Sequence, residues 1–383
     1  MHHISPEELA LYGMFSTSIM LMSTLLSMGL RQTFMLEYYH HSIEQRLLLL
    51  KNLIAIYVIV SLPLSILAFS MTGFLPSEIP HNLFYLALAI AWLSFFSELF
   101  YQWLIYTKQT NFLVGSQLFG AFVAGISIIV LYNLRLLNGC TACISVSLVT
   151  TTPALISLMY FYYLLLDTSA SVSLPLLLTY VKIGAPFIPT IFANWCILSS
   201  QRFIIAHKCS LHDAGLYSII DIMHQVCALL LLQTFATLVL PEIFERFNNS
   251  ASLVEENKRI LNVMQYTMTG LLVAGLLLYL PAYYCVQRII PAIYLPVLPL
   301  TLIAYIGNVF LLGTYFLQCL VQFKKMTLFL SISLCVSGIV SLLLSKILIP
   351  LYGLQGAVWA TTLAYVFYFL MSLKYNSIAL KSI

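Results

Sequence analysis

A few ionisable side chains inside long apolar segments are the residues of this sequence that could do chemistry. Such groups are costly in hydrocarbon, so they usually face a water-filled cavity or one another. A cation in such a cavity can bind phosphate, and a carboxylate or a histidine can couple transport to a cation or a proton. The candidates are Arg31, Glu98, Lys182, Arg202, Asp221 and His224.

Three of these candidates are cations that could bind an anionic headgroup. Arg202 lies about a turn and a half from the outer end of its segment, where it could fork onto a phosphate or extend to the interface. Lys182 begins the same segment at its inner end, and Arg31 ends the first segment. Each of these two could contact a diphosphate on entry or anchor a helix at the cytoplasmic interface.

The other three candidates could couple transport to an ion. Asp221 and His224 are three residues apart and share a helix face, and Asp221 could also pair with Arg202. His224 titrates near neutral pH, although a hydrogen-bonded core histidine is the alternative. Glu98 lies about 15 Å inside the cytoplasmic boundary and is either a cation-coupling acid or an acid satisfied between helices.

The composition requires lipid as the solvent for most of the chain. Of the 383 residues 61% are hydrophobic and 8% are charged, against about 45–50% and about 25% in soluble domains. A spanning helix needs about 20 apolar residues. We therefore predict an all-α, polytopic membrane bundle of eleven helices, at roughly 9–30, 52–73, 83–107, 112–132, 146–166, 181–206, 214–240, 261–285, 295–321, 326–348 and 355–373.

The placement of lysine and arginine predicts the orientation. If the loop after the first helix is cytoplasmic, most of these residues fall on the cytoplasmic side, as the positive-inside rule requires. The N-terminus is then outside and the C-terminus inside.

Two related motifs indicate an internal repeat. Ser5 to Tyr12 and Ser210 to Tyr217 each place a serine three residues before an acid and a tyrosine four residues after it, as at a capped helix start. We predict two pseudo-symmetric lobes, residues 1–170 with five helices and 171–383 with six. The first helix of a six-plus-six plan is then missing. Pro186 and Pro189 can break helix 181–206 and form a hinge between moving parts, or a static kink.

Several motifs together resemble one family. They are Gly184-Ala185-Pro186 with Pro189, Ser200 to Ile205, Asp213 to Ser218, Pro350 to Thr361, and Ser5 to Gly13. In order and spacing they resemble the O-antigen and exopolysaccharide flippases of the multidrug, oligosaccharidyl-lipid and polysaccharide exporter superfamily. Gln201 stands where that family often has aspartate.

The resemblance implies alternating access in the bacterial inner membrane. The substrate would be an undecaprenyl-diphosphate-linked oligosaccharide, moved from the inner to the outer leaflet. A cation-coupled multidrug exporter of the same superfamily is the alternative. A membrane glycosyltransferase or polymerase fits less well, because the predicted outer loops are short and no nucleophile or phosphate-binding loop appears.

No cofactor, metal ion or nucleic acid is expected. No basic run is interleaved with aromatic residues. Cys140 and Cys143 form a single CxxC in a predicted loop, which lacks the second half of a zinc site. They are two small loop residues or, in an oxidising compartment, a local disulfide.

Overall fold

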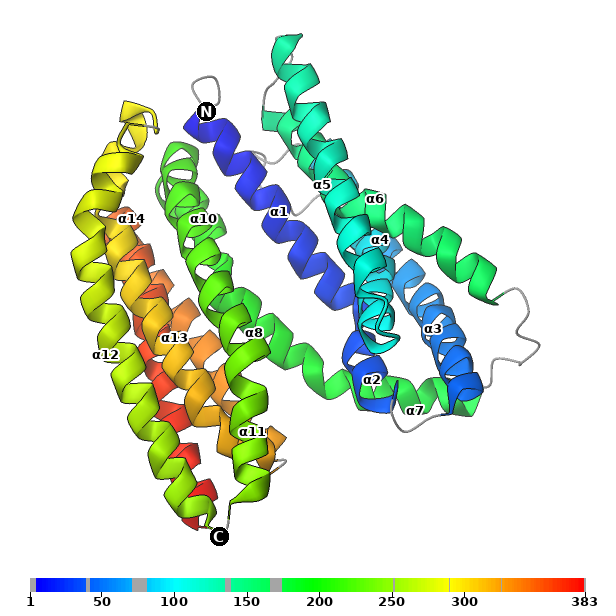
Figure 1. Cartoon of the computed structure of the whole chain (residues 1–383). Helices are drawn as coiled ribbons and strands as arrows, with labels where there is room; N and C mark the ends of the chain where they lie inside the picture. The colour runs from blue at the N-terminus through cyan, green and yellow to red at the C-terminus, as the bar shows by residue number, and fades with distance from the viewer. Residues whose placement is uncertain are drawn as a thin grey trace. The chain divides into compact units, whose positions relative to one another are not determined.

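The computed structural model of the chain is helical throughout its described part (Figure 1). The residues described are 5–38, 42–70, 81–134, 139–165, 174–250, 252–288, 290–324 and 326–381. Contacts divide the chain into two compact units. The N-terminal unit is residues 11–191, and the C-terminal unit is residues 1–10 with 192–383.

Across the described ranges, the N-terminal unit contains seven α-helices and the start of an eighth. They are most of α1 (Pro6–Ser27), α2 (Leu30–Glu37), α3 (Ile43–Ser70), α4 (His81–Tyr106), α5 (Thr110–Asn133), α6 (Gly139–Leu165), α7 (Leu174–Gly184) and the start of α8 (Ile188–Leu198).

The C-terminal unit holds the remaining helices and the first turn of α1. They are most of α8, then α9 (Ser200–Lys208), α10 (Leu211–Thr234), the π-helical turn η4 (Phe235–Val239), α11 (Leu240–Asn249), α12 (Leu253–Val286), the 3₁₀ turn η5 (Ala292–Val297), α13 (Leu300–Phe323) and α14 (Thr327–Lys381).

The predicted polytopic helix bundle is confirmed. Among the described residues, ten helices are long and apolar enough to cross a membrane. The last of them, α14, is interrupted at Gly353, where φ is 55° and ψ is −130°. Because each half is long enough to span, α14 accounts for both of the last two predicted segments.

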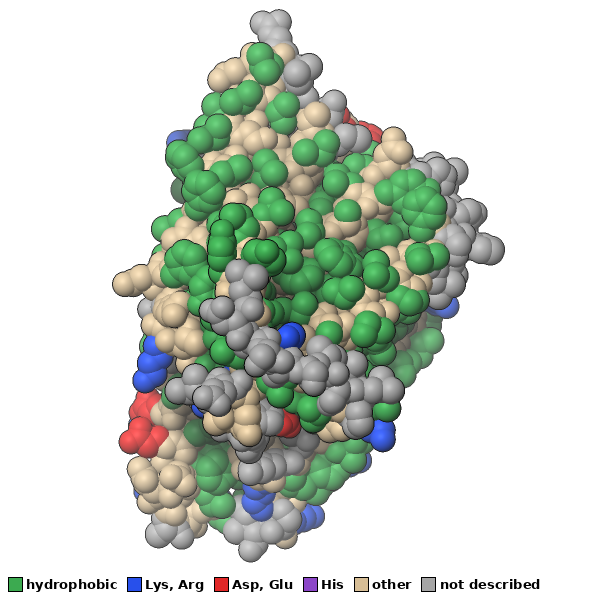
Figure 2. Space-filling view, turned by 90° about the vertical axis from the view of Figure 1, so that its right-hand side faces the viewer, with side chains coloured by type: hydrophobic (Ala, Val, Ile, Leu, Met, Phe, Trp, Pro, Cys, Tyr) green, Lys and Arg blue, Asp and Glu red, His purple; other side chains and the backbone are tan. Residues whose placement is uncertain are grey.

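Exposed apolar side chains show where lipid must cover the protein. Along α5, Leu118 is 65% exposed and Phe122 is 64% exposed. Figure 2 shows hydrophobic side chains across much of one face, with charged side chains mostly toward its lower part. Soluble monomeric proteins rarely expose so large an apolar patch, so lipid must cover it.

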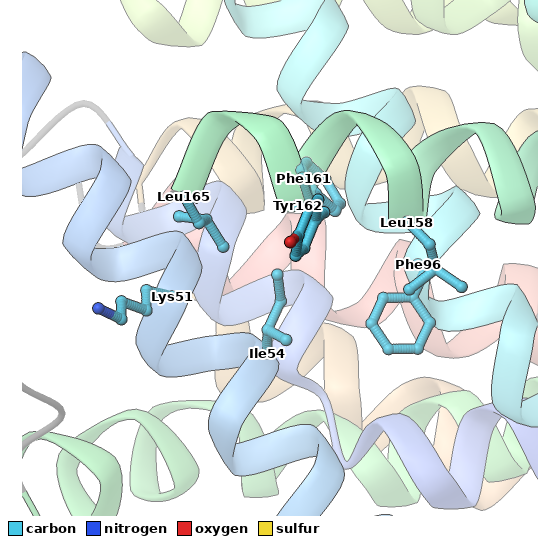
Figure 3. A pocket seen from close by; sticks show the side chains of 7 residues that line it. All are labelled: Lys51, Ile54, Phe96, Leu158, Phe161, Tyr162 and Leu165. Atoms are coloured by element: carbon cyan, nitrogen blue, oxygen red, sulfur yellow. The ribbon is translucent and has the colours of Figure 1, made fainter. Parts of the chain in front are cut away.

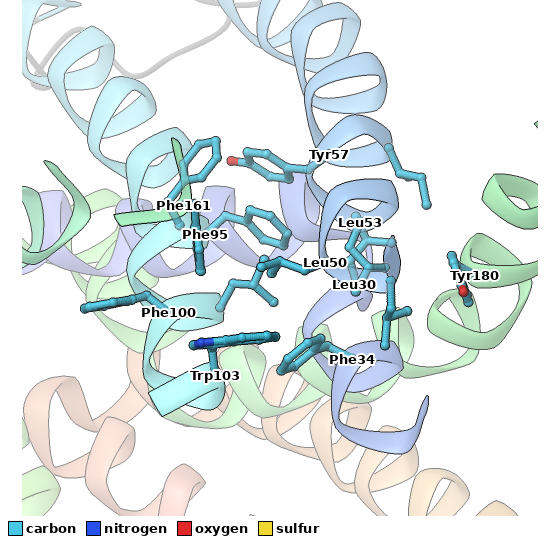
Figure 4. Close-up of a cluster of buried hydrophobic side chains, with 14 of the residues drawn as sticks. Leu30, Phe34, Leu50, Leu53, Tyr57, Phe95, Phe100, Trp103, Phe161 and Tyr180 are labelled. Atoms are coloured by element: carbon cyan, nitrogen blue, oxygen red, sulfur yellow. The ribbon is translucent and has the colours of Figure 1, made fainter. Parts of the chain in front are cut away.

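An aromatic core holds the N-terminal unit together (Figure 4). Tyr57 of α3 stacks on Phe95 of α4, with ring centroids 3.8 Å apart and planes 10° from parallel. Phe34 of α2 packs on Trp103 at the end of α4, with centroids 6.4 Å apart. These contacts fix α2 and α3 against α4.

Both repeated serine motifs cap a helix. The amide of Glu8 donates to Ser5 Oγ at 3.3 Å, and the amide of Ser5 donates to Glu8 Oε2 at 3.1 Å. In the second copy, the amide of Asp213 donates to Ser210 Oγ at 3.0 Å. The first motif is therefore a reciprocal capping box at the start of α1, and the second is a serine N-cap at the start of α10, where Ser210 Oγ also donates to Asp213 Oδ2 at 2.7 Å.

The predicted helix 181–206 is broken into three. A 3₁₀ turn, η3 (Ala185–Phe187), separates α7 from α8, and Ser199 separates α8 from α9. Proline lacks an N–H and clashes with the preceding turn, which explains the break around Pro186 and Pro189. The compact units divide the chain within this segment, at 191/192, whereas the lobes predicted from the repeat meet at 170/171.

The prediction that Cys140 and Cys143 lie in a loop was wrong. Helix α6 begins at Gly139, so both residues fall in its first turns. Cys143 is buried, whereas the side chain of Cys140 lies outside the described residues. Helix α6 extends back to Gly139 because no helix-breaking residue lies between that glycine and the apolar segment.

Candidate functional site

The C-terminal unit contains a buried ion pair between Arg202 and Asp221. Arg202 Nη2 donates to Asp221 Oδ2, and the two side chains are 5% and 2% exposed. Gln225 Nε2 donates to the same carboxylate oxygen at 2.9 Å. The sequence predicted that Asp221 could pair with Arg202, and the structure contains that pair.

The short connection between α9 and α10 explains why these charges meet. Only Cys209 and Ser210 separate the two helices, which pack against each other. Arg202 lies about two turns before this connection, and Asp221 lies about three turns after it. The two side chains are therefore brought to a similar depth from neighbouring helices.

His224 lies one turn beyond Asp221 and is 6% exposed. Its ring stacks on Tyr365 of α14, with centroids 5.8 Å apart. The ring lies close enough to the backbone of Ala304 to interact with it. Within the described residues, however, neither ring nitrogen has a partner at normal hydrogen-bond distance and angle. Asn308 Nδ2 of α13 donates to the His224 carbonyl at 3.0 Å. Helices α10, α13 and α14 thus enclose a polar group with unused hydrogen-bonding capacity.

The N-terminal unit contains a second, looser pair between Arg31 and Glu98. Arg31 Nη1 lies 3.7 Å from Glu98 Oε2, and the side chains are 41% and 35% exposed. Glu98 also interacts with Ser23 of α1, and Ser94 Oγ donates to Ser23 Oγ at 2.8 Å. The carboxylate therefore lies between α1, α2 and α4, with about a third of its side-chain surface exposed.

A bend between α1 and α2 positions Arg31. Met28 and Gly29 have φ values of 45° and 72°, a left-handed conformation that ends one helix and redirects the next. Gly29 packs directly on the backbone of Gly184 at the end of α7. A side chain at either glycine would separate the two segments.

Lys182 belongs to the N-terminal unit, on a helix that packs against the helix of Arg31. It is exposed on α7, which packs against α2. Thr33 Oγ1 of α2 donates to the Tyr180 carbonyl of α7 at 3.2 Å. Lys182 and Arg31 therefore lie on neighbouring helices of the N-terminal unit, while Arg202 belongs to the C-terminal unit.

The predicted hinge residues are both in the break between α7 and α8. Pro186 lies in η3, and Pro189 is the second residue of α8, where it is exposed. The side chain of Pro186 lies outside the described residues. The backbone geometry is that of an interrupted helix.

The sequence does not single out four polar residues that surround the two sites: Ser23, Ser94, Gln225 and Asn308. Each is a polar residue inside an apolar helix, which is the signal that could have identified it. Gln225 also stands four residues after Asp221, on the same helix face. In the described ranges, no group of three or more His, Cys, Asp or Glu side chains could hold a metal ion.

The fold is shared along its full length with solved transporters. An inward-facing multidrug resistance MATE family transporter of the MOP superfamily matches with a TM-score of 0.68 and 12% identity, over 99% of this chain and 91% of that one. The lipid II flippase MurJ, in an inward closed conformation, matches with a TM-score of 0.67 and 15% identity, over 97% and 84%. The chain has the fold of MOP-superfamily transporters.

A third structure has the same fold. A MATE protein in complex with MaD3S matches with a TM-score of 0.56 and 15% identity, over 99% of this chain and 90% of that one. No protein-family model matches the sequence, and no curated protein matches it.

The two ion pairs can do different chemistry. A pair that is buried and further hydrogen-bonded is neutralised in place, so neither charge is offered to a ligand. A half-exposed pair at 3.7 Å can separate when a cation or a proton takes up the carboxylate. The Arg31–Glu98 site is therefore the better candidate for exchange.

Proposed function

We propose that this chain is a MOP-type transporter that moves an undecaprenyl-diphosphate-linked oligosaccharide across the bacterial inner membrane by alternating access. The observation that carries the transporter class is the shared fold, which covers at least 97% of this chain in all three comparisons. The substrate class rests on the motifs that resemble the polysaccharide flippases and is consistent with the likeness to a lipid II flippase. In this proposal the C-terminus is cytoplasmic.

The diphosphate of the substrate would be bound by the cations of the N-terminal unit. Arg31 and Lys182 lie on packed helices, α2 and α7, and arginine and lysine are the usual phosphate ligands in proteins. Arg202 is already paired with Asp221, so it would meet phosphate only in a state in which that pair has opened.

The acid Glu98 would couple this binding to a cation. When a proton or a metal cation neutralises Glu98, the carboxylate no longer attracts Arg31. The guanidinium is then released toward the diphosphate. Ion uptake and headgroup binding would thus be linked through one weak ion pair. Asp221 and His224, in the C-terminal unit, form a second candidate coupling site.

A genetic deletion tests the substrate class. Loss of the gene should abolish surface polysaccharide and cause lipid-linked units to accumulate inside the cell. Plasmid-borne wild type should restore export, and Arg31→Gln should restore less than a tenth of it. Normal surface glycan in the deletion strain would rule the flippase out.

The second candidate is a cation-coupled multidrug exporter. The likeness to MATE family transporters and the partly exposed Glu98 favour it. It predicts that overexpression lowers drug susceptibility and that Glu98→Gln removes the effect. The flippase proposal predicts unchanged susceptibility in the same strains.

A further inference from the structure

A groove of the N-terminal unit, outside both ion-pair sites, has the form of a ligand pocket. Its volume is about 640 Å³, within the range of about 300–1,000 Å³ of small-molecule sites. Helices α3, α4 and α6 supply its lining: Lys51, Ile54, Phe96, Leu158, Phe161, Tyr162 and Leu165. Figure 3 shows Lys51 and Leu165 toward one end and Leu158 and Phe96 toward the other.

The floor of the groove is rigid and apolar. Phe96 of α4 is 3% exposed and packs edge-on against Tyr57, with centroids 5.6 Å apart. Its ring also contacts Trp92, with centroids 5.2 Å apart. Because these ring contacts hold Phe96 in place, the floor does not collapse and the groove stays available to a ligand.

The two ends of the groove differ in depth. Lys51 lies near the start of the candidate span Gln45–Ile66 and Leu165 closes the candidate span Cys143–Leu165, so we place the Lys51 end of the groove close to a membrane surface. Leu158 lies seven residues earlier, which is about 10 Å deeper along the helix. Tyr162 is 65% exposed between them, as expected of an interfacial tyrosine.

We propose that this groove binds an acyl chain of an anionic phospholipid whose phosphate contacts Lys51. Lipid is the solvent around a spanning segment, and the apolar walls suit an acyl chain and not a polar solute. The ammonium group has three donors, so a contact with the protein leaves donors for a phosphate. A basic residue beside an apolar pocket at the membrane surface favours anionic headgroups.

This inference requires only that α3, α4 and α6 span a membrane. It does not depend on which substrate the protein moves. We expect about fivefold more binding of phosphatidylglycerol than of phosphatidylcholine with the same acyl chains, since one lysine near an anionic surface contributes about 1 kcal/mol.

Photo-crosslinking tests the proposal on the full chain in nanodiscs. A phosphatidylglycerol with a diazirine in its acyl chain should label Ile54, Leu158 or Phe161, as mapped by peptide mass spectrometry. Lys51→Gln should lower this labelling about fivefold, and Lys51→Arg should retain it. The matched control is Lys108→Gln, at an exposed lysine of the same unit outside the groove.

A second variant keeps the test independent of Lys51. Leu158→Trp narrows the groove and should reduce labelling by both phospholipids. Equal labelling by the two headgroups, or unchanged labelling in Lys51→Gln, would overturn the proposal. Displacement by substoichiometric undecaprenyl phosphate would also overturn it, because the groove would then hold a polyprenyl tail.

Discussion

The two units of this protein each contain an arginine–carboxylate pair, and the pairs differ in burial and geometry. Arg202 and Asp221 are almost fully buried and share a hydrogen bond with Gln225. Arg31 and Glu98 are about 40% and a third exposed, and 3.7 Å separates the nearest charged atoms. Two pairs made of the same kinds of side chain therefore differ in how far they are shielded from their surroundings.

The difference in burial indicates which ion pair stabilises the fold and which can separate to bind a ligand or an ion. Breaking a buried pair leaves one charge without water or partner, which costs about 3–5 kcal/mol. A partly exposed pair contributes about 0–1 kcal/mol, since water replaces the lost partner. We infer that the C-terminal pair fixes α9 to α10 and that the N-terminal pair can open during function.

The largest expected effect is from removing one member of the buried pair. Asp221→Leu should lower the free energy of unfolding by about 3–5 kcal/mol, because Arg202 stays buried without its counterion. Thermal unfolding of the purified protein in detergent measures this. The double variant Arg202→Met with Asp221→Leu should recover most of the loss. A single variant as stable as the double would contradict the account.

A smaller effect is expected at the bend that positions Arg31. Gly29→Ala should cost about 1–2 kcal/mol from the left-handed backbone alone, with a further loss from the contact with Gly184. The matched control is Gly115→Ala in α5, where an added Cβ meets no atom within 4 Å. That change should be neutral or slightly stabilising. Equal stability of the two variants would show that the bend is not fixed by this packing.

The smallest effect on stability is expected at the exposed pair. Glu98→Gln should change the free energy of unfolding by less than about 1 kcal/mol while lowering transport at least tenfold and removing its dependence on the ion gradient. Glu7→Gln provides a matched control, since Glu7 Oε1 pairs with His212 Nδ1 at 2.9 Å and both side chains are nearly half exposed. Glu98→Gln with wild-type transport would remove Glu98 from the mechanism.

Much of the fold follows from the sequence because the bilayer fixes the length of an apolar helix. Ten of the eleven predicted spans match observed helices when the two halves of α14 are counted separately, whereas the predicted helix 181–206 is broken into α7, α8 and α9. The serine motifs cap α1 and α10. The Arg202–Asp221 pair was predictable because a short connection joins its two helices.

Other features depend on contacts between distant segments. The left-handed bend at Met28 and Gly29 packs on the backbone of Gly184, and a contact between segments so far apart in the chain is not predicted by the local sequence. The local sequence therefore does not predict that Arg31 pairs with Glu98. It predicts one helix, with a hinge or a kink at Pro186 and Pro189, for both Lys182 and Arg202, whereas these residues lie on the separate helices α7 and α9.

Transport by the purified protein in liposomes is the most direct test of the central claim. An undecaprenyl-diphosphate-linked oligosaccharide is incorporated, and a membrane-impermeant glycosidase reports the fraction exposed on the outer leaflet over time. With wild type and Glu7→Gln, the account predicts that substrate from the inner leaflet becomes accessible to the glycosidase over time. With Glu98→Gln, the accessible fraction should stay at the level of protein-free liposomes. Wild-type protein that exposes no more substrate than protein-free liposomes would contradict it.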